Sequence, residues 1–349
     1  MRRIALAYNA NPTRPIQGMD MIRWVAMGHR FRWLGYKVRL VTDRRRGVDR
    51  LDRIHLTSAD RMDWSECDAI KACYQPSIDL CPPHPHLIVR MCRVVDAEYP
   101  KRDDGRREEM MRQQAKIAEM AAIVAFNDEL NAQRWRERYG NKQQVLLTPT
   151  GCPEKLPEEI HDPFPKDKRI VLFMGSLTSH RFPNTLNALA RRLRAADPDV
   201  EVHFLGKNSL QHYAGESEPL DPSVITIHEP VDEDRTWSYV LHAHVGIGLA
   251  PSELAFESEL SKLYYYLRGG LPVVTESSVP NKTVIDETGH GRVAAYGDVD
   301  DLAHQTLQAL KLKARDERVM QYMVDHHSWR ARAKTYDDAL QARWGCAAN

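Results

Sequence analysis

The sequence predicts an α/β protein made of two domains of alternating strands and helices. First, an apolar strand (residues 4–8), a polar loop, an amphipathic helix and a second strand (residues 37–42) follow one another near the start of the chain. This order is typical of a right-handed βαβ crossover in a parallel sheet. Second, the same pattern restarts near residue 170. Third, a length of 349 residues suits two domains of ordinary size.

The rest of the first half continues the alternation. The loop after the first strand contains one glycine, Gly18, and therefore lacks the G-x-G-x-x-G run of a dinucleotide fingerprint. Further strands are predicted at 69–73, 87–91, 123–126 and 144–147, with helices at 106–122 and 127–139. Asp96 and Glu98 closely follow the strand at 87–91. Because ligands bind beyond the carboxyl ends of parallel strands, these carboxylates are the acid/base candidates of the first half, although a solvated loop also explains them.

Five prolines between residues 149 and 165 mark a semi-rigid linker, because proline fixes φ and removes an N–H donor. The predicted organisation is therefore an N-terminal domain (1–150), a linker (151–166), a C-terminal domain (167–325) and a final helical segment (326–349). In the C-terminal domain, strands are predicted at 170–174, 200–206, 224–227, 245–251 and 271–274, with helices at 185–196, 235–242 and 301–313.

One helix of the C-terminal domain stands out. Its apolar stripe repeats at i, i+3, i+4 and i+7, and a Gly-Gly pair at 269–270 ends it. The opposite, polar face is predicted to carry Ser258, Ser261, Lys262 and Tyr265. Because the N-terminus of a helix has free N–H groups and a positive dipole end, it favours an anion such as a phosphate. An ordinary surface helix would show the same spacing.

The sequence SKLYYYL at 261–267, followed by GLPVV at 270–274, resembles the donor-site signature of the GT-B nucleotide-sugar glycosyltransferases, of the family-4 type. In that family two glutamates eight positions apart bind the donor sugar and the ribose. Glu257 matches the first, whereas Tyr265 occupies the place of the second. The turn at 175–184 resembles the phosphate-binding corner of the same family, where Gly175 matches, Arg181 takes the position of a lysine and Ser176 stands where arginine is common.

The resemblance implies two Rossmann-like domains facing each other across a cleft, with acceptor binding in the first domain and donor binding in the second. It implies that the last helix packs back onto the N-terminal domain. It places Glu257 at the catalytic centre and the loop with Gly18 in the cleft on the acceptor side, where the position after a strand end also predicts Asp96 as a catalytic residue and Glu98 as a neighbour. The donor-binding residues that it implies are Gly175, Ser176, Arg181, His228, Ser258, Ser261, Lys262, Leu263 and Tyr265, with the loop at His228 holding the nucleobase.

The expected function is transfer of a sugar from a nucleoside-diphosphate sugar to an acceptor, which can be a glycan, a lipid-linked sugar or a small molecule. The resemblance favours a retaining, metal-independent enzyme without a cofactor. The alternatives are an epimerase or hydrolase of nucleotide sugars with the same fold, and a non-catalytic protein that binds nucleotide sugars or nucleic acid. The donor sugar, its base, the acceptor and the oligomeric state stay open.

Composition limits the partners. The formal net charge of +1 gives no global signal for nucleic acid. No apolar run has the roughly 18 residues of a membrane span. Six scattered cysteines without a C-x-x-C pair favour a reduced, cytoplasmic protein. Five arginines between residues 44 and 53 form a basic cluster. This cluster is either a solvated loop or a contact for an anionic acceptor or for the inner membrane face.

Overall fold

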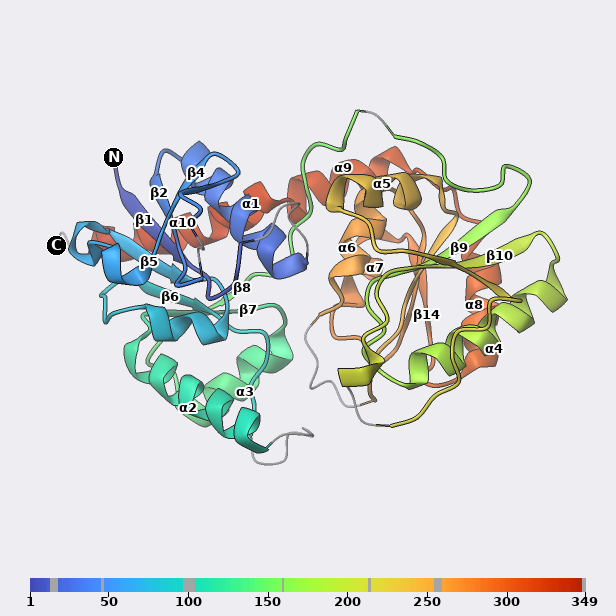
Figure 1. Ribbon diagram of the computed structural model, residues 1–349, viewed down its shortest axis with the longest axis horizontal. Helices are drawn as coiled ribbons and strands as arrows, with labels where there is room; N and C mark the ends of the chain where they lie inside the picture. Colours follow the sequence, from blue (N-terminus) through green and yellow to red (C-terminus); the bar gives the residue numbers. More distant parts are fainter. Residues whose placement is uncertain are drawn as a thin grey trace. The chain divides into compact units, whose positions relative to one another are not determined.

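The structure is a computed structural model, which describes residues 1–12, 18–44, 47–96, 104–158, 160–212, 215–253 and 259–346. The chain forms two compact units. Unit 1 consists of Met1–Gly151 and Ser328–Asn349, and unit 2 consists of Cys152–His327. Each unit is a parallel sheet with helices on both faces (Figure 1). The predicted α/β class with two Rossmann-like domains is confirmed.

Unit 1 has an eight-stranded sheet in the order β3-β4-β2-β1-β5-β6-β7-β8, parallel throughout except for the β3–β4 pair. Its strands are β1 (Arg3–Ala7), β2 (Lys37–Val41), β3 (Arg50–Leu51), β4 (Ile54–Thr57), β5 (Ala69–Ala72), β6 (Leu87–Arg90), β7 (Ile123–Phe126) and β8 (Gln144–Leu147). Its helices are α1 (Met19–Trp33), α2 (Asp104–Met120), α3 (Glu129–Tyr139) and α10 (Trp329–Cys346), with short 3-10 turns η1 (Ala59–Arg61), η2 (Trp64–Glu66) and η3 (Gln75–Leu80). The sequence did not predict β3 and β4.

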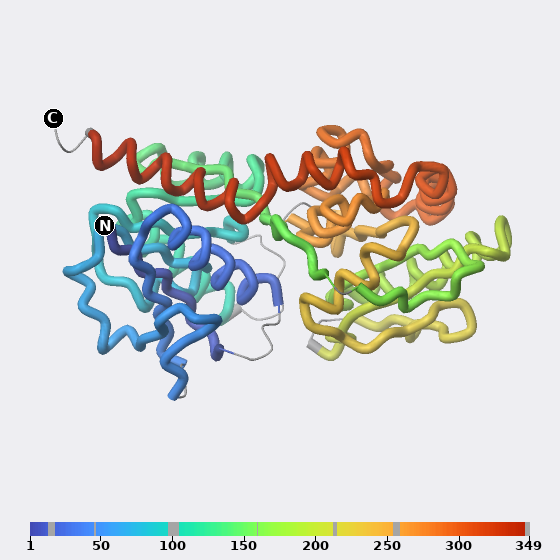
Figure 2. Tube along the Cα trace, turned by 90° about the horizontal axis from the view of Figure 1, so that it is seen from above, coloured from blue at the N-terminus to red at the C-terminus, as the bar shows by residue number. Residues whose placement is uncertain are grey.

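Helices α1 and α10 cover one face of this sheet together. Figure 2 shows α10, in red, lying along α1, in blue. The contact with the strands is close, because a Cβ atom added at Gly28 would lie 2.6 Å from Cδ1 of Ile54. The indole of Trp24 donates a 2.8 Å hydrogen bond to the Leu6 carbonyl, and the hydroxyls of Tyr336 and Thr148 are 2.9 Å apart. The last helix is thus part of the core of unit 1.

Unit 2 has a six-stranded parallel sheet in the order β11-β10-β9-β12-β13-β14. Its strands are β9 (Arg169–Met174), β10 (Val200–Leu205), β11 (Ile225–His228), β12 (Val245–Gly248), β13 (Val273–Glu276) and β14 (Gly291–Ala294). Helices α4 (Arg181–Ala196) and α8 (Val299–Ala309) lie on one face, and α5 (Glu233–His242), α6 (Ser261–Arg268) and α9 (Glu317–His327) on the other (Figure 1). The turn η4 (Leu210–His212) and the helix α7 (Thr283–Thr288) complete this unit.

Candidate functional site

The candidate site lies in unit 2, where the turns that follow β9 and β10 pack against each other. Gly175 ends β9 with φ of 114°, a conformation that favours glycine, and its N–H donates a 2.8 Å bond to the Leu205 carbonyl. A Cβ atom added at Gly206 would lie 2.0 Å from the Gly175 carbonyl oxygen. Gly206 therefore allows the two turns to pack closely, and Gly175 places no side chain between its backbone and the Lys262 side chain. Ser176, the next residue, is exposed.

Helix α6 begins beside this turn. The Asn281 side chain fixes the residue before it, because its oxygen accepts from the Leu260 N–H at 2.8 Å and its nitrogen donates to the Leu260 carbonyl at 3.1 Å. Ser261 is the first helical residue and is partly exposed. Leu263 is fully buried and packs against Gly248, so its side chain belongs to the core. The N–H groups of the first turn have no acceptor within the helix.

Lys262 brings its ammonium to the Gly175 turn. Its Nζ lies 3.7 Å from the centre of the Phe173 ring and 3.5 Å from the position of a Cβ on Gly175. Although Lys262 keeps some exposure, desolvation lowers its pKa to about 7. Within the described part of the chain, the structure gives this ammonium no carboxylate partner. The position of this cation over a glycine turn and at a helix N-terminus is one that favours an anion in proteins.

Arg181 is engaged differently from what the sequence predicts. Its two terminal nitrogens donate to the Glu276 carboxylate at 2.8 and 2.5 Å, and one of them also donates to the Ala250 carbonyl at 2.6 Å. The Glu276 side chain is almost completely buried and also accepts from the N–H groups of Ala250 and Gly297. In this structure Arg181 neutralises a buried carboxylate and joins the ends of several strands. Its contact with a diphosphate stays a prediction.

The prediction that Tyr265 lies on a polar face is wrong. Its side chain is 3% exposed, its ring stacks on Trp237 with centroids 5.0 Å apart, and its hydroxyl donates to Glu233 at 2.6 Å. The physical reason is that α5 covers this side of α6, which the local spacing of apolar residues does not reveal. Burial raises the pKa of the Glu233 carboxyl, while the hydrogen bond from Tyr265 acts in the opposite direction.

His228 ends the edge strand β11. Its ring stacks on His203 with centroids 5.2 Å apart, and the facing ring nitrogens are 2.9 Å apart. Burial lowers the pKa of both imidazoles. The His228 ring is thus used in packing within unit 2, and a contact of the following loop with a nucleobase stays a prediction.

The remaining predicted residues are placed as follows. Gly18 precedes α1 with φ of 81°, and a Cβ there would meet no atom within 4 Å. Asp96 is partly buried next to Val95, whose backbone is held on both sides by the Gln114 side chain. Glu98, Glu257 and Ser258 lie outside the described residues. Of the predicted donor site, the structure therefore places the Lys262 side chain next to Gly175, and Ser261 precedes Lys262 at the start of α6.

Comparison with known proteins adds evidence at the level of structure. No family model and no curated protein matches the sequence. Sucrose-phosphate synthase from Thermosynechococcus elongatus has a TM-score of 0.74 at 14% identity, over 99% of this chain and 100% of that chain. HepE from Anabaena, solved in complex with UDP-glucose, has a TM-score of 0.70 at 11% identity, over 98% and 100%. WaaG, a glycosyltransferase involved in lipopolysaccharide biosynthesis, has a TM-score of 0.65 at 14% identity, over 97% and 99%.

The chain has the GT-B fold. Sequence reasoning missed two residues of this GT-B chain that shape the candidate site. Glu276 reads as an ordinary polar end of β13, and Asn281 follows it in a turn. No local signal marks Glu276 for burial, because a glutamate is almost never fully buried unless it is paired, and its partner Arg181 lies 95 positions away in the sequence. Nothing in the sequence near Asn281 indicates that its amide holds Leu260.

Among the described residues, no helix is long and apolar enough to cross a membrane. No group of three or more His, Cys, Asp or Glu side chains is arranged to hold a metal ion in that part of the chain.

Proposed function

We propose that this protein transfers a glycosyl group from a nucleoside-diphosphate sugar to a hydroxyl group of an acceptor. The observation that carries the proposal is the Lys262 ammonium, which lies over the Gly175 turn at the start of α6 without a carboxylate partner among the described residues. The neighbours support it, since they include a sucrose-phosphate synthase and a structure with UDP-glucose.

In the proposed reaction the bond between the sugar C1 and a diphosphate oxygen breaks, and a bond from C1 to the acceptor oxygen forms. The acceptor proton passes to a base or to the departing phosphate. Negative charge grows on the diphosphate, where the Lys262 ammonium and the N–H groups of the first turn of α6 stabilise it. A single preorganised hydrogen-bond donor of this kind increases kcat by a factor of about 10²–10³.

The proposal assigns Glu257 to the sugar hydroxyls, on the strength of the family resemblance, and Asp96 to the acceptor hydroxyl, because it follows the carboxyl end of β6. It includes retention of the anomeric configuration and neutralisation of the leaving group by Lys262 in place of a metal. NMR of the product anomer tests the first point, and turnover in the presence of a chelator tests the second. An inverted product, or activity lost to a chelator and restored by a divalent cation, would contradict them.

A thermal-shift screen of nucleotides and nucleotide sugars tests donor binding directly. A ligand at 100 times its Kd stabilises the folded state by about 2.7 kcal/mol, which such a screen detects. The donor found is then incubated with and without candidate acceptors. We expect turnover that depends on the acceptor. Consumption of the donor alone would point to an epimerase or hydrolase of the same fold, and no binding of any nucleotide sugar would reject the proposal.

A further inference from the structure

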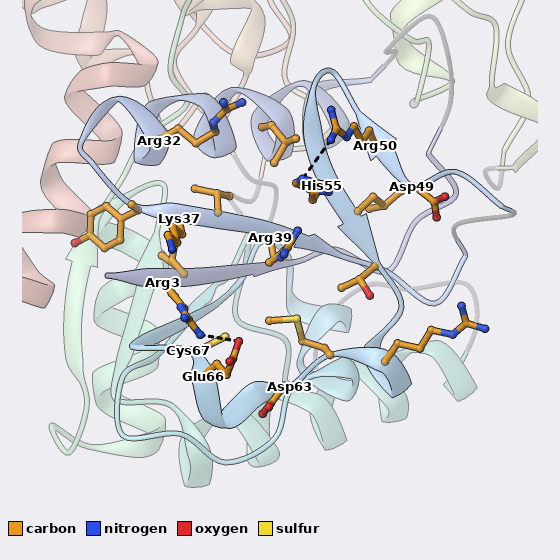
Figure 3. Close-up of a pocket in the computed structure, with 18 of the residues that line it drawn as sticks. Arg3, Arg32, Lys37, Arg39, Asp49, Arg50, His55, Asp63, Glu66 and Cys67 are labelled. Atoms are coloured by element: carbon orange, nitrogen blue, oxygen red, sulfur yellow. Dashed lines mark hydrogen bonds and ion pairs between the residues drawn. The ribbon is translucent and has the colours of Figure 1, made fainter. Parts of the chain in front are cut away.

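A second charged region lies in unit 1. It is a hollow of about 1000 Å³ over β1, β2, β3 and β4 (Figure 3). Among its described lining residues are seven Lys and Arg side chains and only three carboxylates. The hollow is therefore much more positive than the chain as a whole, whose net charge is +1. The cations are Arg3, Arg32, Lys37, Arg39, Arg50, Arg53 and Arg61, and the carboxylates are Asp49, Asp63 and Glu66.

The topology explains why the hollow exists. Helix α1 covers the face of the sheet that carries Leu6, Leu40 and Ile54. Among the described residues no helix covers the opposite face at β2 and β4, because residues 58–68, which lead from β4 to β5, form only the short turns η1 and η2. Parallel strands are usually joined by a helix that covers the sheet. Here the sheet face is left to solvent and carries charged side chains.

The register gathers the charges. Arg3 pairs with Lys37 across β1 and β2, and Arg50 pairs with His55 across β3 and β4. Lys37, Arg39 and His55 are all exposed, and in Figure 3 they lie on the strands that form the floor of the hollow. Along β2, Lys37 and Arg39 are two residues apart, or about 6.6 Å. The cations therefore repeat along and across the strands.

These cations are only partly neutralised. Arg3 pairs with Glu66 at 2.6 Å, but within the described part of the chain no carboxylate lies within ion-pair distance of Lys37 or Arg39. The pKa of His55 is lowered by desolvation first and then by Arg39, Arg50 and Arg32. The arginines that line the hollow therefore disfavour the protonated form of His55, which lies among them.

We propose that this hollow binds an anionic oligosaccharide, a chain of sugars bearing sulfate, phosphate or carboxylate groups. The inference rests on the proposed function, since it names the class of acceptor that unit 1 recognises. Repeated cations fit a ligand with charges along its length better than a single phosphate, and the carboxylates on the rim can accept from sugar hydroxyls. The volume is at the upper end of the ~300–1,000 Å³ usual for ligand sites.

Two other polyanions fit the hollow less well. Single-stranded nucleic acid is bound through aromatic side chains on which bases stack. Among the described lining residues Tyr36 is the sole Phe, Tyr or Trp, it is 6% exposed, and its hydroxyl donates to Asp337. A flat lipid surface would touch the rim and leave the cations of the floor, Lys37 and Arg39, without contact.

The test measures binding to the full chain without donor. The probe is sulfated maltohexaose, and unmodified maltohexaose is its uncharged control. The variant Lys37→Gln/Arg39→Gln removes two charges from the floor, and Lys142→Gln/Lys313→Gln removes two exposed charges elsewhere. Circular dichroism and Tm check that both fold. We expect the sulfated probe to bind, the floor variant to raise its Kd at least tenfold and the control variant to change it less than twofold.

Several results would overturn the proposal. Equal losses in both variants would mean unspecific attraction, and equal binding of unmodified maltohexaose would mean that charge is not recognised. Vesicles with 30% phosphatidylglycerol could bind more tightly than the sulfated probe, with a dependence on Lys37 and Arg39, and the hollow would then be assigned to a membrane surface. The same result with a hexathymidylate would assign it to nucleic acid. Donor binding in the thermal-shift screen is measured separately. A failure of this inference is therefore distinguishable from a failure of the proposed glycosyl transfer.

Discussion

The lowered pKa of Lys262 predicts that donor binding depends on pH. Without a ligand, the Lys262 ammonium has a pKa of about 7, because burial removes its hydration. A diphosphate next to Nζ would restore the charged form and return the pKa toward its ordinary value of about 10.4. The apparent Kd for a nucleotide sugar should therefore rise about thirtyfold between pH 6 and pH 8.5, or ~2 kcal/mol. UDP-glucose is a suitable first probe, because its diphosphate diester keeps the same charge over this range.

Calorimetry of the wild type and of Lys262→Met across this range is the assay. The variant should bind more weakly at pH 6 by about 1.5–3 kcal/mol, the range for a hydrogen bond to a charged group, and its Kd should be flat with pH. Lys313→Met, at an exposed site in the same unit, is the matched control and should behave as the wild type. A Kd for the wild type that does not change with pH would refute the reasoning, and so would a pH dependence that survives in Lys262→Met.

The sign of the stability effect is a second check on the same residue. The folded-state pKa of Lys262 lies below its unfolded value, so the unfolded chain binds more protons between about pH 7 and pH 10. Without a ligand, the contribution of Lys262 to the free energy of unfolding should accordingly increase as the pH rises from about 7 to about 10. In Lys262→Met this contribution should vanish. Chemical denaturation at pH 7 and pH 9.5 compares the two proteins.

Three further predictions concern other residues. Arg181→Ala should destabilise the protein by about 3–5 kcal/mol in urea denaturation, because it leaves the buried Glu276 carboxylate unpaired. The double variant Arg181→Ala/Glu276→Leu should recover part of this loss, and an unchanged urea midpoint for Arg181→Ala would contradict the prediction. Gly206→Ala should cost about 1–3 kcal/mol and weaken donor binding, since its Cβ would meet the Gly175 carbonyl, whereas Gly345→Ala, with open space, should be neutral. Glu257→Gln should cut turnover at least tenfold, about 1.4 kcal/mol, and full activity would reject the family alignment at this position.

The sequence by itself determined the repeated strand, glycine turn and helix units, because each is encoded by apolar spacing and by glycine within a dozen residues. It also led to Gly175 and Lys262, since the family motifs around them are local. The structure then placed these two residues, which are 87 positions apart, next to each other through the parallel pairing of β9 with β12 and of β12 with β13.

Only the tertiary structure decided what Arg181 and Tyr265 contact. The Arg181–Glu276 pair joins residues 95 positions apart, and no local pattern records which carboxylate will be buried beside a given arginine. Tyr265 looks like a residue of a polar helix face until α5 is packed on that side and supplies Trp237 and Glu233.

The basic hollow of unit 1 also follows from the tertiary structure and not from any local sequence pattern. In the sequence, Arg3, Lys37 and Arg39 are the charged members of alternating strands, and the arginines at 50 and 53 are part of a local cluster. Strand register brings them onto one sheet face, and the short connection from β4 to β5 leaves that face uncovered. Periodicity encodes which way a side chain points from its own strand, whereas its neighbours across the sheet are set by chain pairing over long distances.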